Sequence, residues 1–224
     1  MKANIPVQKG EVIEINITGL GSSGEGVGKY QGFTVFVPGA LPTETVKAKV
    51  GLVKKSYATA KIVEILEASA ERVEPACPVY KECGGCQLQH LSYAGQLKMK
   101  EQQVRDALTR IGHLDTEVLS VIGCANPWNY RNKMQFPAAM GVEGKIEIGC
   151  YATATHSVVD TEGCLIQKED NNQVLVAVRK WMEKFNVSAY DEKTGKGLVR
   201  HVMSRVGVHS GEVMAVLITS AYDI

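Results

Sequence analysis

Three cysteines lie within ten residues of one another, in the segment CPVYKECGGCQLQH over residues 77–90. The Gly-Gly pair between Cys83 and Cys86 lets the backbone turn tightly, so both thiols can face one metal centre. With Cys77 upstream, the spacing is Cys-x5-Cys-x2-Cys. A tetrahedral zinc ion or a cubane iron–sulfur cluster needs a fourth ligand. The cysteines that could supply it are Cys124, Cys150 and Cys164.

This cysteine spacing favours an iron–sulfur cluster over zinc. Structural zinc sites usually use two short cysteine pairs, whereas this sequence has one such pair, a third cysteine upstream and others far downstream. Three clustered cysteines with one remote partner are typical of iron–sulfur ligation. Residues 1–6 lack the apolar core of a secretion signal, so disulfides are not expected. Zinc stays the second candidate.

The composition is that of a folded protein with little overall charge. Its 224 residues are 45% hydrophobic and 22% charged, enough for one large domain or two modest ones. Lys and Arg number 25 against 24 Asp and Glu, so the net charge is +1 and any basic surface must be local. No apolar stretch approaches the ~18–20 residues of a membrane span. We therefore expect a cytoplasmic protein that binds no membrane.

Residues 1–66 are predicted to form a small β-barrel. Ile13, Ile15 and Ile17 alternate with polar residues, the period of a half-buried strand. Further β-rich runs follow, and a loop over residues 19–28 holds five glycines. These runs cover residues 30–37, 45–53 and 57–66. Short strands with Gly and Pro turns between them are typical of barrels of the oligonucleotide-binding type.

The predicted barrel carries a local positive charge. Residues 1–66 contain eight Lys and five Glu, for a local charge of +3. Lysines neutralise phosphates and an aromatic ring can stack on a base. The candidate nucleic-acid contacts are Lys47, Lys49, Lys54, Lys55 and Tyr57. The alternative is a solvated strand face, since Lys is a common edge residue.

Two helices are predicted in the rest of the chain, which we assign to a mixed α/β domain over residues 67–224. The first covers residues 91–111 and ends at Gly112, with Leu97, Val104, Leu108 and Ile111 along one face. The second covers residues 170–187, with Leu175, Val178, Met182 and Phe185 along one face. Residues 212–219 are predicted as a strand that lies almost at the end of the sequence, which suggests part of a longer protein.

Several motifs together resemble the RNA uracil-5-methyltransferase family. The segment Cys-x5-Cys-Gly-Gly-Cys-x2-Gln-His is the family's hallmark, and Tyr130-Arg131-Asn132-Lys133 resembles its Tyr-Arg-Asn-Lys segment. The run from Ile148 to Ile166 resembles its Ile-Gly-Phe-Tyr to Cys-x-Ile segment, in which Cys164 matches the fourth cluster ligand. Gly197–His201 resembles its Gly-x-x-Arg-His strand. Residues 1–66 resemble a TRAM domain, an RNA-binding barrel appended to RNA-modifying enzymes.

The resemblance implies a TRAM barrel followed by a mixed α/β domain with an antiparallel sheet and an iron–sulfur cluster site. It assigns a [4Fe-4S] cluster to Cys77, Cys83, Cys86 and Cys164. The cluster would staple distant segments and transfer no electron, because methyl transfer to C5 needs none. Cys150 stands where the family often has Phe, and we interpret it, like Cys124, as a buried thiol.

The resemblance also implies an S-adenosylmethionine-dependent enzyme whose catalytic part is absent from these residues. No glycine-rich turn from a strand into a helix and no Asp-Pro-Pro-Arg segment with a nucleophile occurs in the sequence. We therefore expect no catalytic residue here, a chain inactive by itself, and a helix over residues 91–112 that packs on the missing methyltransferase domain. This portion would bind and orient the RNA.

Further basic residues are expected near RNA in the second domain. Arg131 and Lys133 would share one face of a strand, which suits a groove lined with phosphates. The full set is Arg131, Lys133, Arg200, His201 and Arg205. Surface salt bridges are the alternative for each. Ribosomal RNA is the preferred target over transfer RNA. A stand-alone iron–sulfur protein that binds RNA or transfers electrons is the other interpretation of the whole chain.

Overall fold

The computed structural model describes residues 5–221, apart from the side chain of Glu143. The chain divides into two compact units. The first comprises Met1–Pro75 with Gln87–Gly123, and the second comprises Ala76–Cys86 with Cys124–Ile224. The chain therefore crosses between the units more than once, because the cysteine loop belongs to the second unit while the segments on either side of it belong to the first.

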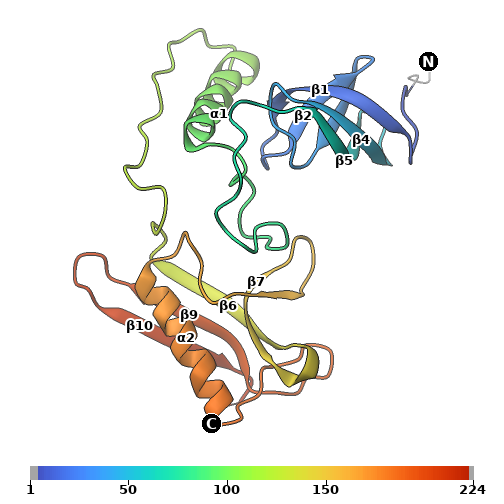
Figure 1. Ribbon diagram of the computed structural model, residues 1–224. Helices are drawn as coiled ribbons and strands as arrows, with labels where there is room; N and C mark the ends of the chain where they lie inside the picture. The colour runs from blue at the N-terminus through green and yellow to red at the C-terminus, as the bar shows by residue number, and fades with distance from the viewer. Residues whose placement is uncertain (1–4, 222–224) are drawn as a thin grey trace. The chain divides into compact units, whose positions relative to one another are not determined.

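The first unit contains a closed five-stranded barrel (Figure 1). Its strands are β1 (Val12–Leu20), β2 (Gly26–Tyr30), β3 (Phe33–Val37), β4 (Thr45–Val53) and β5 (Tyr57–Glu67). They pair in the order β1-β2-β3-β5-β4, with β3 and β5 parallel and the other described pairs antiparallel. Ile13, Ile15 and Ile17 point into the core as the alternation predicted, and each is 2–3% exposed.

The predicted run over residues 30–37 contains all of β3 but only the last residue of β2, so the prediction missed the strand that precedes it. Gln31 and Gly32 have φ angles of 49° and 83° and reverse the chain between β2 and β3. Strand β2 starts inside the glycine-rich segment because its glycines permit close packing. A Cβ on Gly28 would lie 2.4 Å from the carbonyl oxygen of Asn16, and a Cβ on Gly26 would also meet backbone.

The barrel continues into a segment that Arg72 ties back to it. The Arg72 guanidinium donates to both carboxylate oxygens of the buried Glu44, over 2.5 and 2.8 Å. Glu44 also accepts the N–H groups of Leu41 at 2.8 Å and Ser69 at 3.2 Å. These four bonds satisfy a carboxylate that is 1% exposed.

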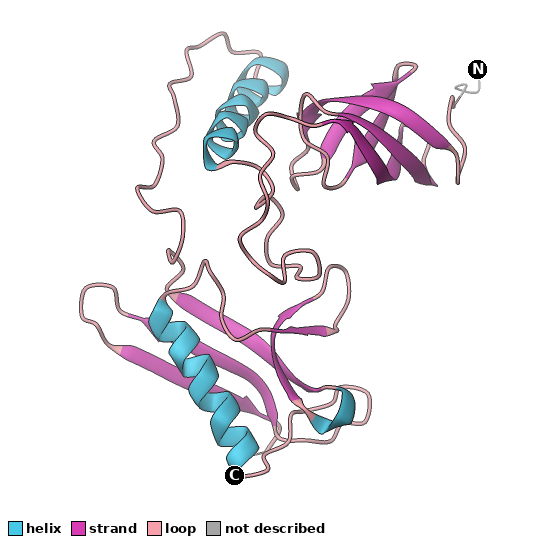
Figure 2. Ribbon diagram, viewed as in Figure 1, coloured by secondary structure: helices cyan, strands magenta, loops and turns pink. Residues whose placement is uncertain are grey.

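The predicted first helix is confirmed as α1 (Tyr93–Asp106), which runs into a π-helical turn over Ala107–Ile111. The Ser92 hydroxyl accepts the N–H of Gly95 at 3.0 Å and caps its start. Its apolar face is only partly covered, since Val104 is 49% and Ile111 is 81% exposed. A long loop without helix or strand follows, as Figure 2 shows.

The second unit is a five-stranded antiparallel sheet with one helix across one face (Figure 1). Its strands are β6 (Lys133–Met140), β7 (Ile146–Tyr151), β8 (Val158–Asp160), β9 (Val199–Val206) and β10 (Val213–Thr219), in the order β10-β9-β6-β7-β8. A short 3₁₀ turn, η2 (Val142–Gly144), joins β6 to β7. The helix is α2 (Glu169–Lys184), which confirms the predicted second helix with slightly earlier ends.

The core of this unit lies between the sheet and α2. Met134 and Phe136 point from β6 toward Leu175 and Met182 of α2, which are both fully buried. Phe185, predicted on the same helical face, is 60% exposed, because the helix ends at Lys184. Neither α1 nor α2 is long and apolar enough to cross a membrane.

The predicted iron–sulfur site is not seen, and the predicted fold class is wrong in that feature. Among residues 5–221, no group of three or more His, Cys, Asp or Glu side chains is placed to hold a metal ion. Cysteine spacing predicts which segments of the chain approach one another. It does not determine whether the sulfur atoms surround one point, since that depends on how the loop and the sheet direct their side chains.

Candidate functional site

Backbone pairing holds the cysteine loop against the end of β7. Cys83 forms an isolated antiparallel bridge with Ala152, and the N–H of Gly84 donates to the carbonyl of Tyr151 over 2.9 Å. A Cβ on Gly84 would lie 2.9 Å from that carbonyl oxygen, so glycine permits this approach. The loop is thereby carried to the strand that contains Cys150.

Cys150 lies beside three of the four thiols that the sequence singled out. Its thiol is a hydrogen-bond partner of Cys83 and lies near Cys86 and Cys164. Burial raises the pKa of Cys150 to about 12, and the neighbouring thiols add to the shift. The sequence signal for its placement was the alternation of Ile146, Ile148 and Cys150 along β7, which puts Cys150 on the face packed against the core.

Cys164 reaches the same region from the loop before α2. Its N–H donates to the side-chain oxygen of Asn172, in the first turn of the helix, over 2.9 Å. Burial raises the pKa of Cys164, and the nearby thiols of Cys86 and Cys77 raise it further. Metal ligation requires thiolates, and a bound metal ion would itself lower the pKa of a coordinating thiol.

The donor atoms thus suit an iron–sulfur cluster in type, but their placement does not make a metal-holding group among the described residues. Cys124 is exposed, contrary to the expectation of a buried thiol, and its sulfur donates to the carbonyl of Asn126 over 3.0 Å. Ligation by Cys77, Cys83, Cys86 and Cys164 stays a prediction from the sequence.

A hollow of about 500 Å³ lies beside the cysteine loop and brings three predicted basic residues together. It is lined by Arg131 just before β6, by Lys133 at the start of β6 and by His201 from β9, with Gly84 and Gly85 of the loop. Burial and then the Arg200 charge lower the pKa of His201, so it is neutral at pH 7. Arg131 and Lys133 therefore supply the positive charge of this basic hollow.

Arg131 lies just before β6, in a segment that pairs with the loop leading to α2. Its N–H donates to the carbonyl of Ile166 over 2.8 Å, and its carbonyl accepts the N–H of Lys168 over 2.9 Å. Lys133 is the register partner of Arg205 on β9, and Arg205 is exposed. The structure thus places two predicted cations on neighbouring strands at this end of the sheet.

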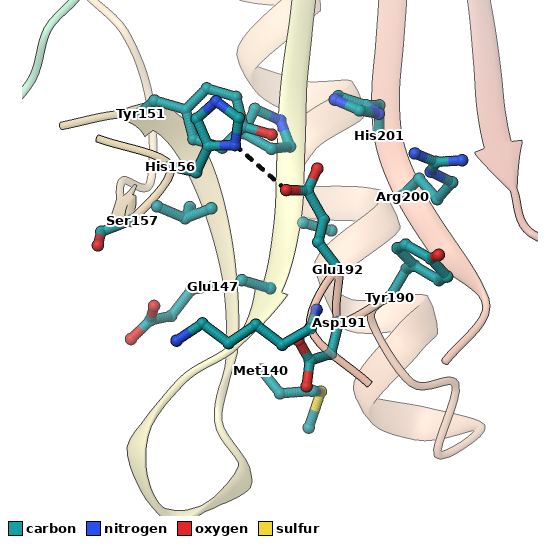
Figure 3. A pocket seen from close by; sticks show the side chains of 15 residues that line it. Met140, Glu147, Tyr151, His156, Ser157, Tyr190, Asp191, Glu192, Arg200 and His201 are labelled. Carbon is teal, nitrogen blue, oxygen red and sulfur yellow. Dashed lines mark hydrogen bonds and ion pairs between the residues drawn. The ribbon is translucent and has the colours of Figure 1, made fainter. Parts of the chain in front are cut away.

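A second hollow, of about 450 Å³, adjoins the first and shares Pro137, Tyr151 and His201 with it. Figure 3 shows the rings of Tyr151 and His156 on one side and Tyr190 and Arg200 on the other. Of these residues, only Arg200 and His201 were predicted to contact RNA. The aromatic residues come from separate segments of the sequence, so only folding brings them to one place.

The predicted contacts of the barrel differ in how accessible their charges are. Lys47 forms an ion pair with Glu64 at 2.9 Å, and this bond, with the charge of Glu64, raises the pKa of Lys47. Tyr57 meets Phe36 edge to face, with ring centroids 5.4 Å apart. The remaining predicted contacts are exposed on β4 and in the turn that follows, and they are Lys49, Lys54 and Lys55.

Comparisons with known proteins agree with the interpretation of the barrel. Residues 6–63 match the model of the TRAM domain. A Clostridium tetani protein named as an RNA methyltransferase is 48% identical over 98% of this chain and 47% of its own length. A Caldanaerobacter subterraneus protein of the same name is 46% identical over 97% of this chain and 48% of its own. The chain spans about half the length of the curated relatives it matches.

One solved structure resembles the backbone of most of this chain. It is the Pyrococcus abyssi tRNA (uracil-54, C5)-methyltransferase in complex with S-adenosyl-L-homocysteine, with a TM-score of 0.68 and 23% identity. The match covers 94% of this chain and 46% of that protein. The chain therefore has the fold of the matched part of that structure. The predicted fold class, a barrel followed by a mixed α/β domain with an antiparallel sheet and an iron–sulfur cluster site, is corrected in its cluster site, which the described residues do not show. The relatives named as RNA methyltransferases support the predicted resemblance of this chain to such enzymes.

Proposed function

We propose that this chain is the RNA-binding portion of an S-adenosylmethionine-dependent RNA (uracil-C5)-methyltransferase. The observation that carries the proposal is the 48% identity to a protein named as an RNA methyltransferase over 98% of this chain. The TRAM barrel and the basic hollow beside the cysteine loop support RNA as the ligand. The backbone similarity to the Pyrococcus abyssi tRNA (uracil-54, C5)-methyltransferase supports uracil C5 as the methylated position.

The proposed reaction needs a target uridine that is unstacked from folded RNA. A cysteine thiolate adds to C6, which makes C5 nucleophilic, and C5 takes the methyl group from S-adenosylmethionine as S-adenosylhomocysteine leaves. A base then removes the C5 proton, and the cysteine is expelled. We assign none of these catalytic groups to the present residues. Their contribution is to bind and orient the RNA, in a protein that we expect in the cytoplasm.

The basic hollow is tested by neutralising Lys133. A lysine that contacts a phosphate contributes to affinity through released counterions, irrespective of base sequence. For Lys133→Gln we expect weaker binding of every structured RNA tested, and a plot of log affinity against log salt whose slope falls by about 1. Fluorescence anisotropy at several salt concentrations measures both.

Lys180→Gln is the matched control, because Lys180 is exposed on α2 and lines neither hollow. It should leave the salt slope unchanged. An equal slope for the wild type and Lys133→Gln would show that this hollow is not part of the RNA-binding surface.

The preferred RNA is tested by competition for binding to the wild-type chain. Ribosomal RNA fragments are expected to displace a labelled RNA better than transfer RNA does, and the reverse order would favour a transfer RNA substrate.

Metal content tests the four-thiol prediction independently of RNA. If Cys77, Cys83, Cys86 and Cys164 ligate a [4Fe-4S] cluster, protein purified without oxygen contains iron and labile sulfide, and Cys86→Ser loses both together with folded yield. Cys124→Ser is the control, since Cys124 is exposed. Wild-type protein free of iron and sulfide would contradict the prediction. The proposed RNA binding does not depend on a bound metal, whether or not iron and sulfide are found.

A further inference from the structure

The hollow in Figure 3 has two walls that carry rings, and the Glu192 carboxylate lies between them. Glu147 and Asp191 also line it. The rings of Tyr151 and His156 stack with centroids 5.0 Å apart and planes 18° apart. Across from them, the Arg200 guanidinium lies 4.7 Å above the Tyr190 ring. Between the walls, Glu192 pairs with Nδ1 of His156 at 3.2 Å.

We propose that this hollow binds one unpaired guanine of the RNA substrate, stacked on the Tyr151–His156 wall and recognised by Glu192. The proposal rests on the proposed RNA-binding function and deepens it by naming a nucleotide that the chain selects. Its volume of about 450 Å³ falls within the range of small-ligand pockets, about 300–1,000 Å³.

The aromatic walls supply the stacking surface. Proteins that bind single-stranded nucleic acid stack unpaired bases on aromatic side chains and on Arg guanidinium planes. Here the exposed His156 ring is supported from behind by Tyr151, so the platform keeps its orientation without a ligand. Arg200 is likewise held by Tyr190. Both surfaces are therefore set before RNA arrives, which reduces the entropy lost on binding.

Glu192 supplies the selectivity for guanine. Its Oε2 contacts His156, whereas among the residues that the structure describes Oε1 has no hydrogen-bond partner. Asp191, the neighbouring acid, is occupied by bonds from the N–H of Lys193 at 2.8 Å and the hydroxyl of Thr194 at 2.9 Å. A carboxylate only accepts hydrogen bonds. Guanine offers two adjacent donors, N1–H and the 2-amino group, whereas uracil offers only its N3–H.

The position of the hollow favours a nucleotide within an RNA strand. It shares Tyr151 and His201 with the basic hollow, where Arg131 and Lys133 lie. A strand whose phosphates follow those two cations can therefore place an adjacent nucleotide between the aromatic walls. Arg200, which is exposed and lines the same hollow, adds a further positive charge beside that nucleotide.

The test measures base preference with the full chain. Labelled single-stranded RNAs of about 12 nucleotides consist of uridine throughout, or of uridine with one central guanosine, adenosine or cytidine. We expect the wild type to bind the guanosine oligomer about 10-fold more tightly than the all-uridine one. This ratio is typical of the discrimination that one well-paired base contact provides. Glu192→Gln should reduce that ratio to about 1, because an amide presents a donor where the carboxylate has only acceptors.

Glu183→Gln is the matched control, since it makes the same chemical change on the exposed surface of α2, and it should keep the 10-fold ratio. His156→Ala changes a side chain that is 76% exposed, so it should fold normally. Loss of stacking should weaken its binding of the guanosine oligomer about 5-fold or more.

The outcomes separate this inference from the function on which it rests. Equal wild-type affinity for all four oligomers, or a ratio that survives Glu192→Gln, would overturn the guanine site. If Lys133→Gln still lowered the salt slope in that case, the proposed RNA-binding function would stand. A wild-type chain that bound no RNA would overturn both.

Discussion

Arg179→Ala is expected to destabilise the second unit by about 3 kcal/mol, the lower end of the cost of breaking a buried charged pair, because Asp160 is only partly buried. The Arg179 guanidinium, 13% exposed, pairs with Asp160 at 2.7 Å. It also donates to the carbonyls of Ile146 at 2.8 Å, Ile148 at 3.3 Å and Thr161 at 2.8 Å. One side chain thus ties α2 to β7 and to the end of β8, and its removal takes one donor from each of these acceptors.

Tryptophan fluorescence during urea unfolding measures this loss selectively. The chain has two tryptophans, and both Trp128 and Trp181 belong to the second unit. Lys180→Ala is the control, because this exposed neighbour on α2 should change the free energy of unfolding far less. Arg179→Lys should recover only part of the loss, since an ammonium cannot reproduce the planar fork of donors. Unchanged stability of Arg179→Ala would contradict the role of this side chain.

The loss from Arg179→Ala should also depend on pH. Burial would raise the pKa of Asp160, but hydrogen bonds from Ile148 and Arg179, with the charges of Arg179 and Lys145, outweigh it and lower the pKa. A carboxyl with a lowered folded pKa stabilises the protein above its unfolded pKa of about 3.9 and loses that contribution as the pH falls through the folded value. The difference between wild type and Arg179→Ala should therefore shrink below about pH 4.

Glu44→Ala is expected to destabilise the first unit by about 3–5 kcal/mol. It removes the carboxylate that Arg72 binds through two donors and leaves the N–H groups of Leu41 and Ser69 without their acceptor. Burial would raise the pKa of Glu44, but these four hydrogen bonds and the Arg72 charge lower it. Its stabilising contribution is therefore present above about pH 4.3 and is lost as the pH falls through the folded pKa.

Far-UV circular dichroism in urea follows this change, because neither tryptophan lies in the first unit. Glu64→Ala is the matched control. Glu64 also forms an ion pair between segments of the barrel, with Lys47, but both side chains are largely exposed and water screens their charges. Equal effects of Glu44→Ala and Glu64→Ala would contradict the importance of the buried pair.

The sequence by itself determined the helices, the last strand and most of the barrel strands, because they follow from local periodicity. The alternation of Ile13, Ile15 and Ile17 predicted the first barrel strand, and the apolar spacing predicted α1 and α2. In the barrel the exception was β2, where Gly26 and Gly28 look like loop residues. Their role depends on backbone close to them in space, and periodicity carries no such information.

Only the tertiary structure decided what gathers at the candidate site. Pairing of Cys83 and Gly84 with the end of β7 brings the cysteine loop to Cys150. Cys150 was not counted among the cluster ligands predicted from the sequence. The second hollow combines Tyr151 and His156 with residues some 40 positions further along the chain. Such a site depends on sheet order and on contacts between distant segments. Neither is encoded in the spacing of any single motif, so the chemistry of the hollow emerged only once the chain was folded.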